Sequence, residues 1–107
     1  MQGPGLNFTR GSRMNESTKN AILACITKQG KFKGTFKRTL PRPGVERAAW
    51  LGVMLVFNPY KVGMGAVMML TNAQRVVMDD ATLWAENNQH LRFADRDRGT
   101  LETLGAW

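Results

Sequence analysis

Apolar residues recur at helical spacing near the start of the chain and predict a helix over residues 17–29. Ser17 is a favourable N-cap residue, and Gly30 suits the position just beyond a helix C-terminus. Because the segment carries few charges, we expect this helix to pack on a sheet. Its apolar face is formed by Ala21, Ile22, Ala24, Cys25 and Ile26.

Residues 31–40 alternate between apolar and polar positions, which predicts a half-buried strand with a cationic outer face. Arg38 departs from the alternation, and Pro41-Arg42-Pro43-Gly44 predicts a turn after the strand. The apolar face carries Phe32, Gly34, Phe36 and Leu40, and the polar face carries Lys31, Lys33, Thr35, Lys37 and Thr39.

Two uninterrupted apolar runs follow, over residues 48–57 and 62–70. The first shows neither alternation nor a helical stripe, and Gly52, Val53 and Val56 lower its helix propensity, so we expect a central strand buried on both faces. Residues 58–61 suit a hairpin turn, which makes the second run the returning strand. Each run is too short to span a bilayer as a helix, which takes ~20 residues, so no membrane span is predicted.

The last third of the chain is predicted to hold a second helix over residues 72–86. Thr71 and Gln74 form a capping-box pattern at its start, although a hairpin at Asp79-Asp80 is the alternative. Residues 90–94 alternate and predict a last strand, followed by a charged turn over residues 95–99. The final segment, residues 101–107, suits a short helix that tucks Trp107 against the body.

The resulting order, α-β-β-β-α with a C-terminal tail, predicts an α+β fold in which a helix layer packs on a small antiparallel sheet. This order is similar to that of the double-stranded RNA-binding domain. Such domains begin their second helix with lysines that grip phosphates, whereas here the sequence reads Thr71-Asn72-Ala73-Gln74-Arg75. That motif is missing, so membership is not inferred.

Composition adds a strong charge asymmetry to this picture. The 107 residues carry a net charge of +7, with +9 in residues 1–61 and −2 in residues 62–107. Residues 1–13 are interpreted as a flexible Gly-rich leader, of the kind that cloning adds, ahead of a single domain over residues 14–107. Cys25 is the only cysteine, which rules out an internal disulfide and favours a reducing, cytoplasmic setting.

The candidate catalytic and metal-binding residues are few, and we predict a non-enzymatic protein without a cofactor. His90 is the only histidine, so neither a nucleophilic triad nor a structural zinc site is expected. Asp79 and Asp80 are adjacent and point in different directions, which is typical of a solvated face. The spacing of Asp95, Asp97 and Glu102 does not match a calcium-binding loop.

The cationic strand face is one candidate binding site. Lysines on alternate positions stand ~7 Å apart, close to the spacing of phosphates along a nucleic-acid strand. The alternative is a solvated strand edge protected by lysines. The residues predicted to bind RNA or DNA are Lys31, Lys33, Lys37, Arg38 and Arg42.

The methionine-rich middle of the chain is the other candidate. Two adjoining strands that are apolar on both faces need two covering layers, and one helix layer supplies only one of them. We therefore expect a homo-oligomer in which a second chain covers the open face, with a small-molecule pocket and ordinary core filling as alternatives. The predicted interface or pocket residues are Trp50, Met54, Met64 and Met68.

Overall fold

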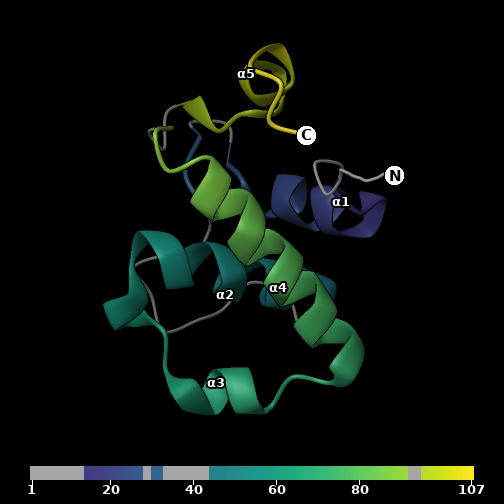
Figure 1. Cartoon of the computed structure of the whole chain (residues 1–107), viewed down its shortest axis with the longest axis vertical. Coiled ribbons are helices and arrows are strands. Elements are labelled where there is room, and N and C mark those ends of the chain that lie inside the picture. Colours follow the sequence, from purple (N-terminus) through teal and green to yellow (C-terminus); the bar gives the residue numbers. More distant parts are fainter. Residues whose placement is uncertain (1–13, 28–29, 33–43, 92–94) are drawn as a thin grey trace.

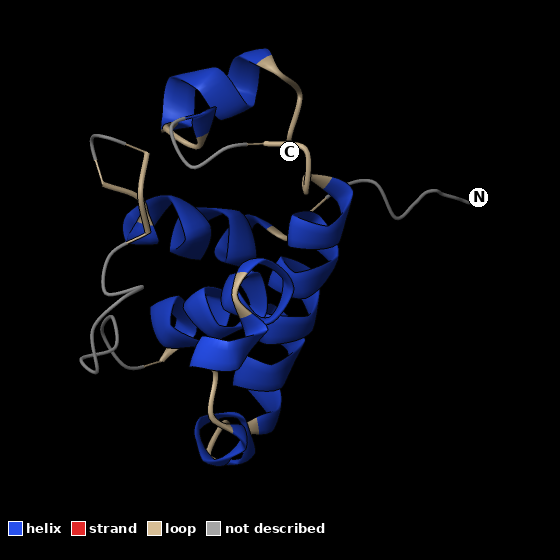
Figure 2. Ribbon diagram, turned by 90° about the vertical axis from the view of Figure 1, so that its left-hand side faces the viewer, coloured by secondary structure: helices blue, strands red, loops and turns tan. Residues whose placement is uncertain are grey.

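The described part of the chain is built from helices (Figure 1). The computed structural model describes residues 14–27, 30–32, 44–91 and 95–107. The elements are α1 (Glu16–Cys25), α2 (Val45–Phe57), the 3-10 helix η1 (Pro59–Lys61), α3 (Met64–Met68), α4 (Asn72–Asn87) and α5 (Arg98–Thr103). Figure 2 shows helices and loops and no strand among the described residues. The predicted α+β fold with an antiparallel sheet is therefore wrong.

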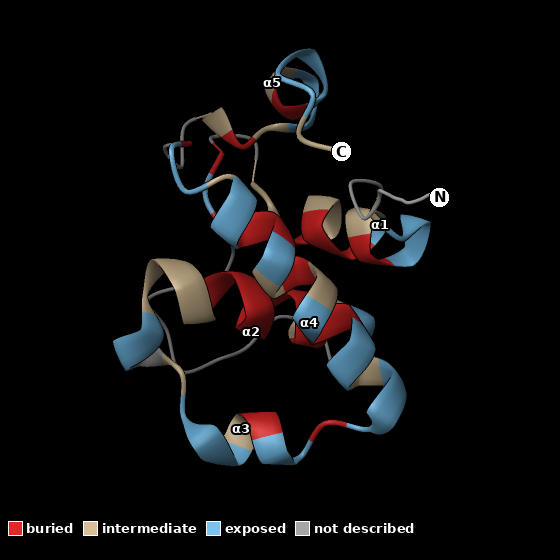
Figure 3. Ribbon diagram, viewed as in Figure 1, coloured by how far each residue is buried: buried red, intermediate tan, exposed pale blue. Residues whose placement is uncertain are grey.

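Helix α2 replaces the central strand predicted over residues 48–57. Its residues 48–54 are all buried, so apolar side chains are needed on every side and no amphipathic stripe exists to reveal the helix. Figure 3 shows this buried segment crossing behind α4. Gly52 lies where α2 meets α4, and its missing side chain lets the two backbones approach.

A side-chain hydroxyl bridges α2 and α4 at this crossing. Thr82 Oγ1 lies 2.8 Å from the carbonyl oxygen of Met78, one turn earlier in α4, and 3.3 Å from that of Gly52. The Thr82 hydroxyl thus makes a polar contact with both helices inside a largely apolar interface.

The predicted first helix is present as α1, but it ends at Cys25 instead of residue 29. Asn15 caps its start, because the Asn15 side chain accepts a hydrogen bond of 2.8 Å from the Ser17 N–H. At the other end Ile26 adopts extended backbone and forms an isolated antiparallel bridge with Phe32. Gly30, with φ of 75°, serves the turn between them and not the helix C-terminus.

Helix α4 confirms the prediction over residues 72–86 and excludes the hairpin at Asp79-Asp80. The Thr71 hydroxyl accepts from the Gln74 N–H, and the Gln74 side chain accepts from the Thr71 N–H, which completes the capping box. Asp80 interrupts the apolar stripe because it accepts a hydrogen bond of 3.2 Å from the buried Thr18 hydroxyl of α1.

The second apolar run forms no returning strand either. Val62 leads to Gly63, the N-cap of α3, and the helix ends at Met68, before α4 begins. Val67 and Leu70 are buried and hold this segment to the core. Figures 1 and 2 place α3 at one end of the molecule and α5 at the other.

The C-terminal segment closes over α1 and α4. Leu101 of α5 is fully buried, and the ring of Trp107 stacks on that of Trp84 with centroids 5.6 Å apart. The Trp84 indole N–H donates to the carbonyl of Ala106 over 3.0 Å, and Lys19 of α1 lies 5.5 Å from the Trp107 ring centre. The predicted packing of Trp107 is confirmed. The strand predicted over residues 90–94 falls largely outside the described residues, and so does the strand predicted over residues 31–40. The predicted leader, residues 1–13, lies wholly outside them.

Candidate functional site

Large apolar side chains stand exposed on α3 and the segments that flank it. Met64, Met68 and Met69 are 67, 71 and 78% exposed, and Tyr60 of η1 is almost fully exposed. Val76, on the first turns of α4, is 62% exposed. We call these five residues the Met–Tyr surface. Met64 and Met68 belong to α3 and Met69 directly follows it. Figure 3 shows that much of α3 is exposed.

Local sequence explains why the methionines face outward. Met64 and Met68 are four residues apart in a helix and therefore share one face, while Val67 occupies the buried face. Leu70 is buried directly after the helix, which leaves Met69 in the exposed turn between them. Val67 and Leu70 thus anchor this segment to the core, and the methionine thioethers lie on its exposed side.

The three methionines of the Met–Tyr surface lie in a region of the sequence without formal charge. Residues 62–74 contain neither acidic nor basic residues. Charged residues border this stretch on both sides. In the sequence Lys61 follows Tyr60, and the exposed Arg75 and Asp79 stand one turn apart on α4 on either side of Val76. The site is therefore apolar in its centre and carries both signs of charge at its α4 edge, which is the composition of an interaction surface.

The structure separates the four residues that the sequence grouped as an interface or pocket. Trp50 and Met54 are buried in the core on α2, whereas Met64 and Met68 are exposed on α3. Tyr60, Met69 and Val76 were not predicted as site residues. The one signal in the sequence was the four-residue spacing of Met64 and Met68, which is typical of one helical face.

Of the predicted nucleic-acid-binding residues, the structure describes Lys31, which is exposed beside the Ile26–Phe32 bridge. Lys33, Lys37, Arg38 and Arg42 lie outside the described residues. Nucleic-acid binding by this segment stays a prediction.

No group of three or more His, Cys, Asp or Glu side chains within the described ranges could hold a metal ion. His90 is exposed after the end of α4, and Cys25 is buried, with its thiol 3.4 Å from the carbonyl of Glu46. Asp97 caps α5, where its carboxylate accepts from the N–H and the hydroxyl of Thr100 at 2.9 Å each. These backbone and side-chain hydrogen bonds lower the pKa of Asp97 below its usual 3.8.

A buried arginine joins the segment before α5 to the end of α2. Arg96 is 1% exposed, its guanidinium lies 3.9 Å from the ring centre of Phe57, and it donates to the carbonyl of Leu91. Burial lowers the pKa of Arg96 to about 10, while the nearby Asp95 acts in the opposite direction. Because the guanidinium is enclosed by the chain itself, it offers little to a ligand.

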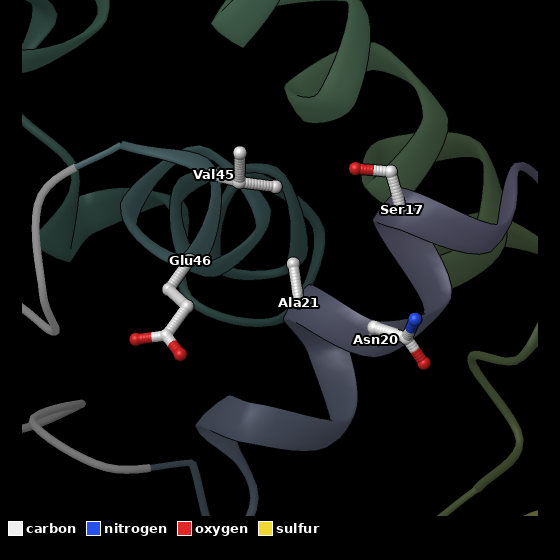
Figure 4. A pocket seen from close by; sticks show the side chains of 5 residues that line it. All are labelled: Ser17, Asn20, Ala21, Val45 and Glu46. Carbon is white, nitrogen blue, oxygen red and sulfur yellow. The ribbon is translucent and has the colours of Figure 1, made fainter.

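A shallow depression of about 280 Å³ lies between α1 and α2 (Figure 4). Its lining side chains are Ser17, Asn20, Ala21, Val45 and Glu46. The depression is open to solvent and contains none of the methionines, so it is not the apolar pocket that the sequence suggested.

Comparison with known protein families, curated proteins and solved structures finds no match. Among the described helices, none has the combined length and apolar character that crossing a bilayer requires.

Proposed function

We propose that this chain is a non-enzymatic binding protein whose Met–Tyr surface binds an apolar surface of another polypeptide. The observation that carries the proposal is the outward orientation of Met64, Met68 and Met69, three methionines within six residues. Leaving such side chains in water forgoes ~1.5–3 kcal/mol each relative to full burial. Clustered exposed apolar side chains are typical of surfaces that a partner covers.

The shape of the site favours a polypeptide over a small molecule. Small ligands bind in concave sites that enclose most of their surface. Here the exposed methionines belong to a short helix, α3, or directly follow it, and α3 lies at one end of the molecule (Figure 1). Trp50 and Met54 belong to the core. Methionine has three rotatable bonds and a polarisable sulfur, so it adapts to the relief of a protein surface.

A photo-crosslinking experiment in intact cells tests this proposal, because it captures whichever polypeptide contacts the site. The photoreactive residue p-benzoylphenylalanine replaces Met68 in one variant and Glu102 in a matched control, since Glu102 is exposed on α5 at the other end of the molecule. We expect a discrete polypeptide adduct from position 68, several-fold stronger than from position 102, and its loss when Met64→Lys is added. No adduct at position 68, or equal adducts at both positions, would overturn the proposal.

A further inference from the structure

We infer that the polypeptide bound by the Met–Tyr surface is a second copy of this chain, related by a two-fold axis that passes beside α4 at the level midway between Arg75 and Asp79. The inference rests on the proposed function and adds the identity of the partner. A two-fold interface is self-complementary, because residue i contacts residue j of the partner and residue j contacts residue i.

The charges at the α4 edge have this self-complementary pattern. Arg75 and Asp79 are both exposed and lie one turn apart on α4. When two α4 helices pack antiparallel about the midpoint of this pair, Arg75 faces the partner's Asp79 and Asp79 faces the partner's Arg75. Opposite charges therefore meet at both contacts of the pair.

The same arrangement brings apolar side chains together. Val76 lies beside the midpoint of the pairing, and Leu83, 48% exposed, lies six residues beyond it on α4. With a rise of 1.5 Å per residue, Leu83 stands about 9 Å after the axis and the start of α4 about 8 Å before it. Met69, just before that start, therefore lies at about the level of the partner's Leu83 along α4.

Sedimentation equilibrium of purified protein, with charge-reversal variants, tests the arrangement. Arg75→Asp creates two like-charged contacts per dimer, and so does Asp79→Arg, so each single change is expected to weaken dimerisation about tenfold. The double variant Arg75→Asp/Asp79→Arg restores opposite charges at both contacts and is expected to dimerise within about threefold of the parent. The matched control is Arg98→Asp, a reversal at an exposed position of α5, which should leave the dimer unchanged.

A second pair of variants tests the apolar part. Met68→Lys places a charge in the interface and should abolish the dimer, whereas Met68→Leu keeps a similar apolar volume and should retain it. Circular dichroism confirms that each variant keeps its helices, so that loss of the dimer is not loss of the fold.

The outcomes separate the inference from the proposed function. A dimer that single reversals weaken and the double reversal restores supports the two-fold arrangement. A dimer insensitive to these reversals, or not rescued by the double change, overturns it. A monomer at all concentrations, with position 68 crosslinking to a different polypeptide, overturns the second copy as partner but leaves the proposed function standing.

Discussion

Gly52 of α2 lies so close to Met78 of α4 that a β-carbon at position 52 would overlap the Met78 carbonyl oxygen. The same β-carbon would lie 2.9 Å from the β-carbon of Ala81 and 3.1 Å from the Thr82 nitrogen. Two of these three neighbours are backbone atoms, which cannot move aside as a flexible side chain can. The absence of a side chain at position 52 therefore sets the distance between the two central helices.

Gly52→Ala should accordingly destabilise the protein although alanine is the better helix former. Separating α2 from α4 loosens the core, and we expect a loss of about 3 kcal/mol or more in the free energy of unfolding. The measurement is urea denaturation followed by circular dichroism. Stability within about 0.5 kcal/mol of the parent would show that the helices adjust freely.

Gly65→Ala is the matched control for that substitution. Gly65 lies in α3, and a β-carbon there meets no atom within 4 Å. The change should raise the free energy of unfolding by about 0.4–1 kcal/mol, because alanine restricts the unfolded chain and favours the helix. A destabilisation as large as that of Gly52→Ala would contradict the packing argument.

The cap of α5 predicts a pH dependence of stability. Hydrogen bonds from Thr100 lower the pKa of Asp97 in the folded state, so its stabilising contribution is present above its ordinary pKa of 3.8 and is lost as the pH falls through the lower, folded value. Asp97→Asn keeps a capping oxygen that does not titrate. Its thermal midpoint should therefore fall less than that of the parent between about pH 6 and about pH 2.5. Parallel pH profiles would contradict this role.

The stacked pair of Trp84 and Trp107 predicts that the last residue stabilises the domain. Trp107→Ala removes an aromatic contact and exposes the Trp84 ring, and we expect a loss of ~2–3 kcal/mol. In a Trp50→Phe background, where Trp84 is the remaining tryptophan, the fluorescence of Trp107→Ala should shift to the red. Trp107→Phe keeps a ring on Trp84 and should lose about half as much. An unchanged emission maximum in Trp107→Ala would mean that Trp84 is already in water.

Oxidation by hydrogen peroxide should distinguish the surface methionines from those of the core. Met64, Met68 and Met69 are exposed, whereas Met54 is fully buried and Met78 is 8% exposed. At submicromolar protein concentration, peptide mapping by mass spectrometry should find sulfoxide at the three exposed positions several-fold faster than at the other two. Equal rates at Met54 and Met64 would contradict the assigned burial.

The sequence predicted the helices that carry local signals and failed where long-range packing decides. The capping box of Thr71 and Gln74 located the start of α4, and the apolar face around Ile22 located α1. In α2, Gly52 and Val53 favoured the prediction of a strand. In the structure Gly52 allows α2 to cross α4 closely, and Val53 is fully buried in a helix that is covered on all sides. No local periodicity reports that crossing.

The candidate site was predicted in part for the same reason. Met64 and Met68 were named as interface residues, but Trp50 and Met54 were grouped with them because all four were placed on two adjoining strands. Once the runs fold as α2 and α3, the first pair enters the core and the second stays outside. Met64, Met68 and Met69 face solvent because Val67 and Leu70 are the residues of this segment that enter the core. Sequence spacing alone did not predict which of these apolar residues would be buried.

The contact between Lys19 and Trp107 joins the first described helix to the last residue of the chain. A contact between positions so distant in sequence requires the whole intervening chain to close, which slows its formation relative to the local turns of α4. The capped helix α4 and its packing on α2 can therefore form before the C-terminal segment docks. In refolding, recovery of the helical signal would precede the change in Trp84 emission, and the interval between the two would measure the time that the C-terminal segment takes to dock.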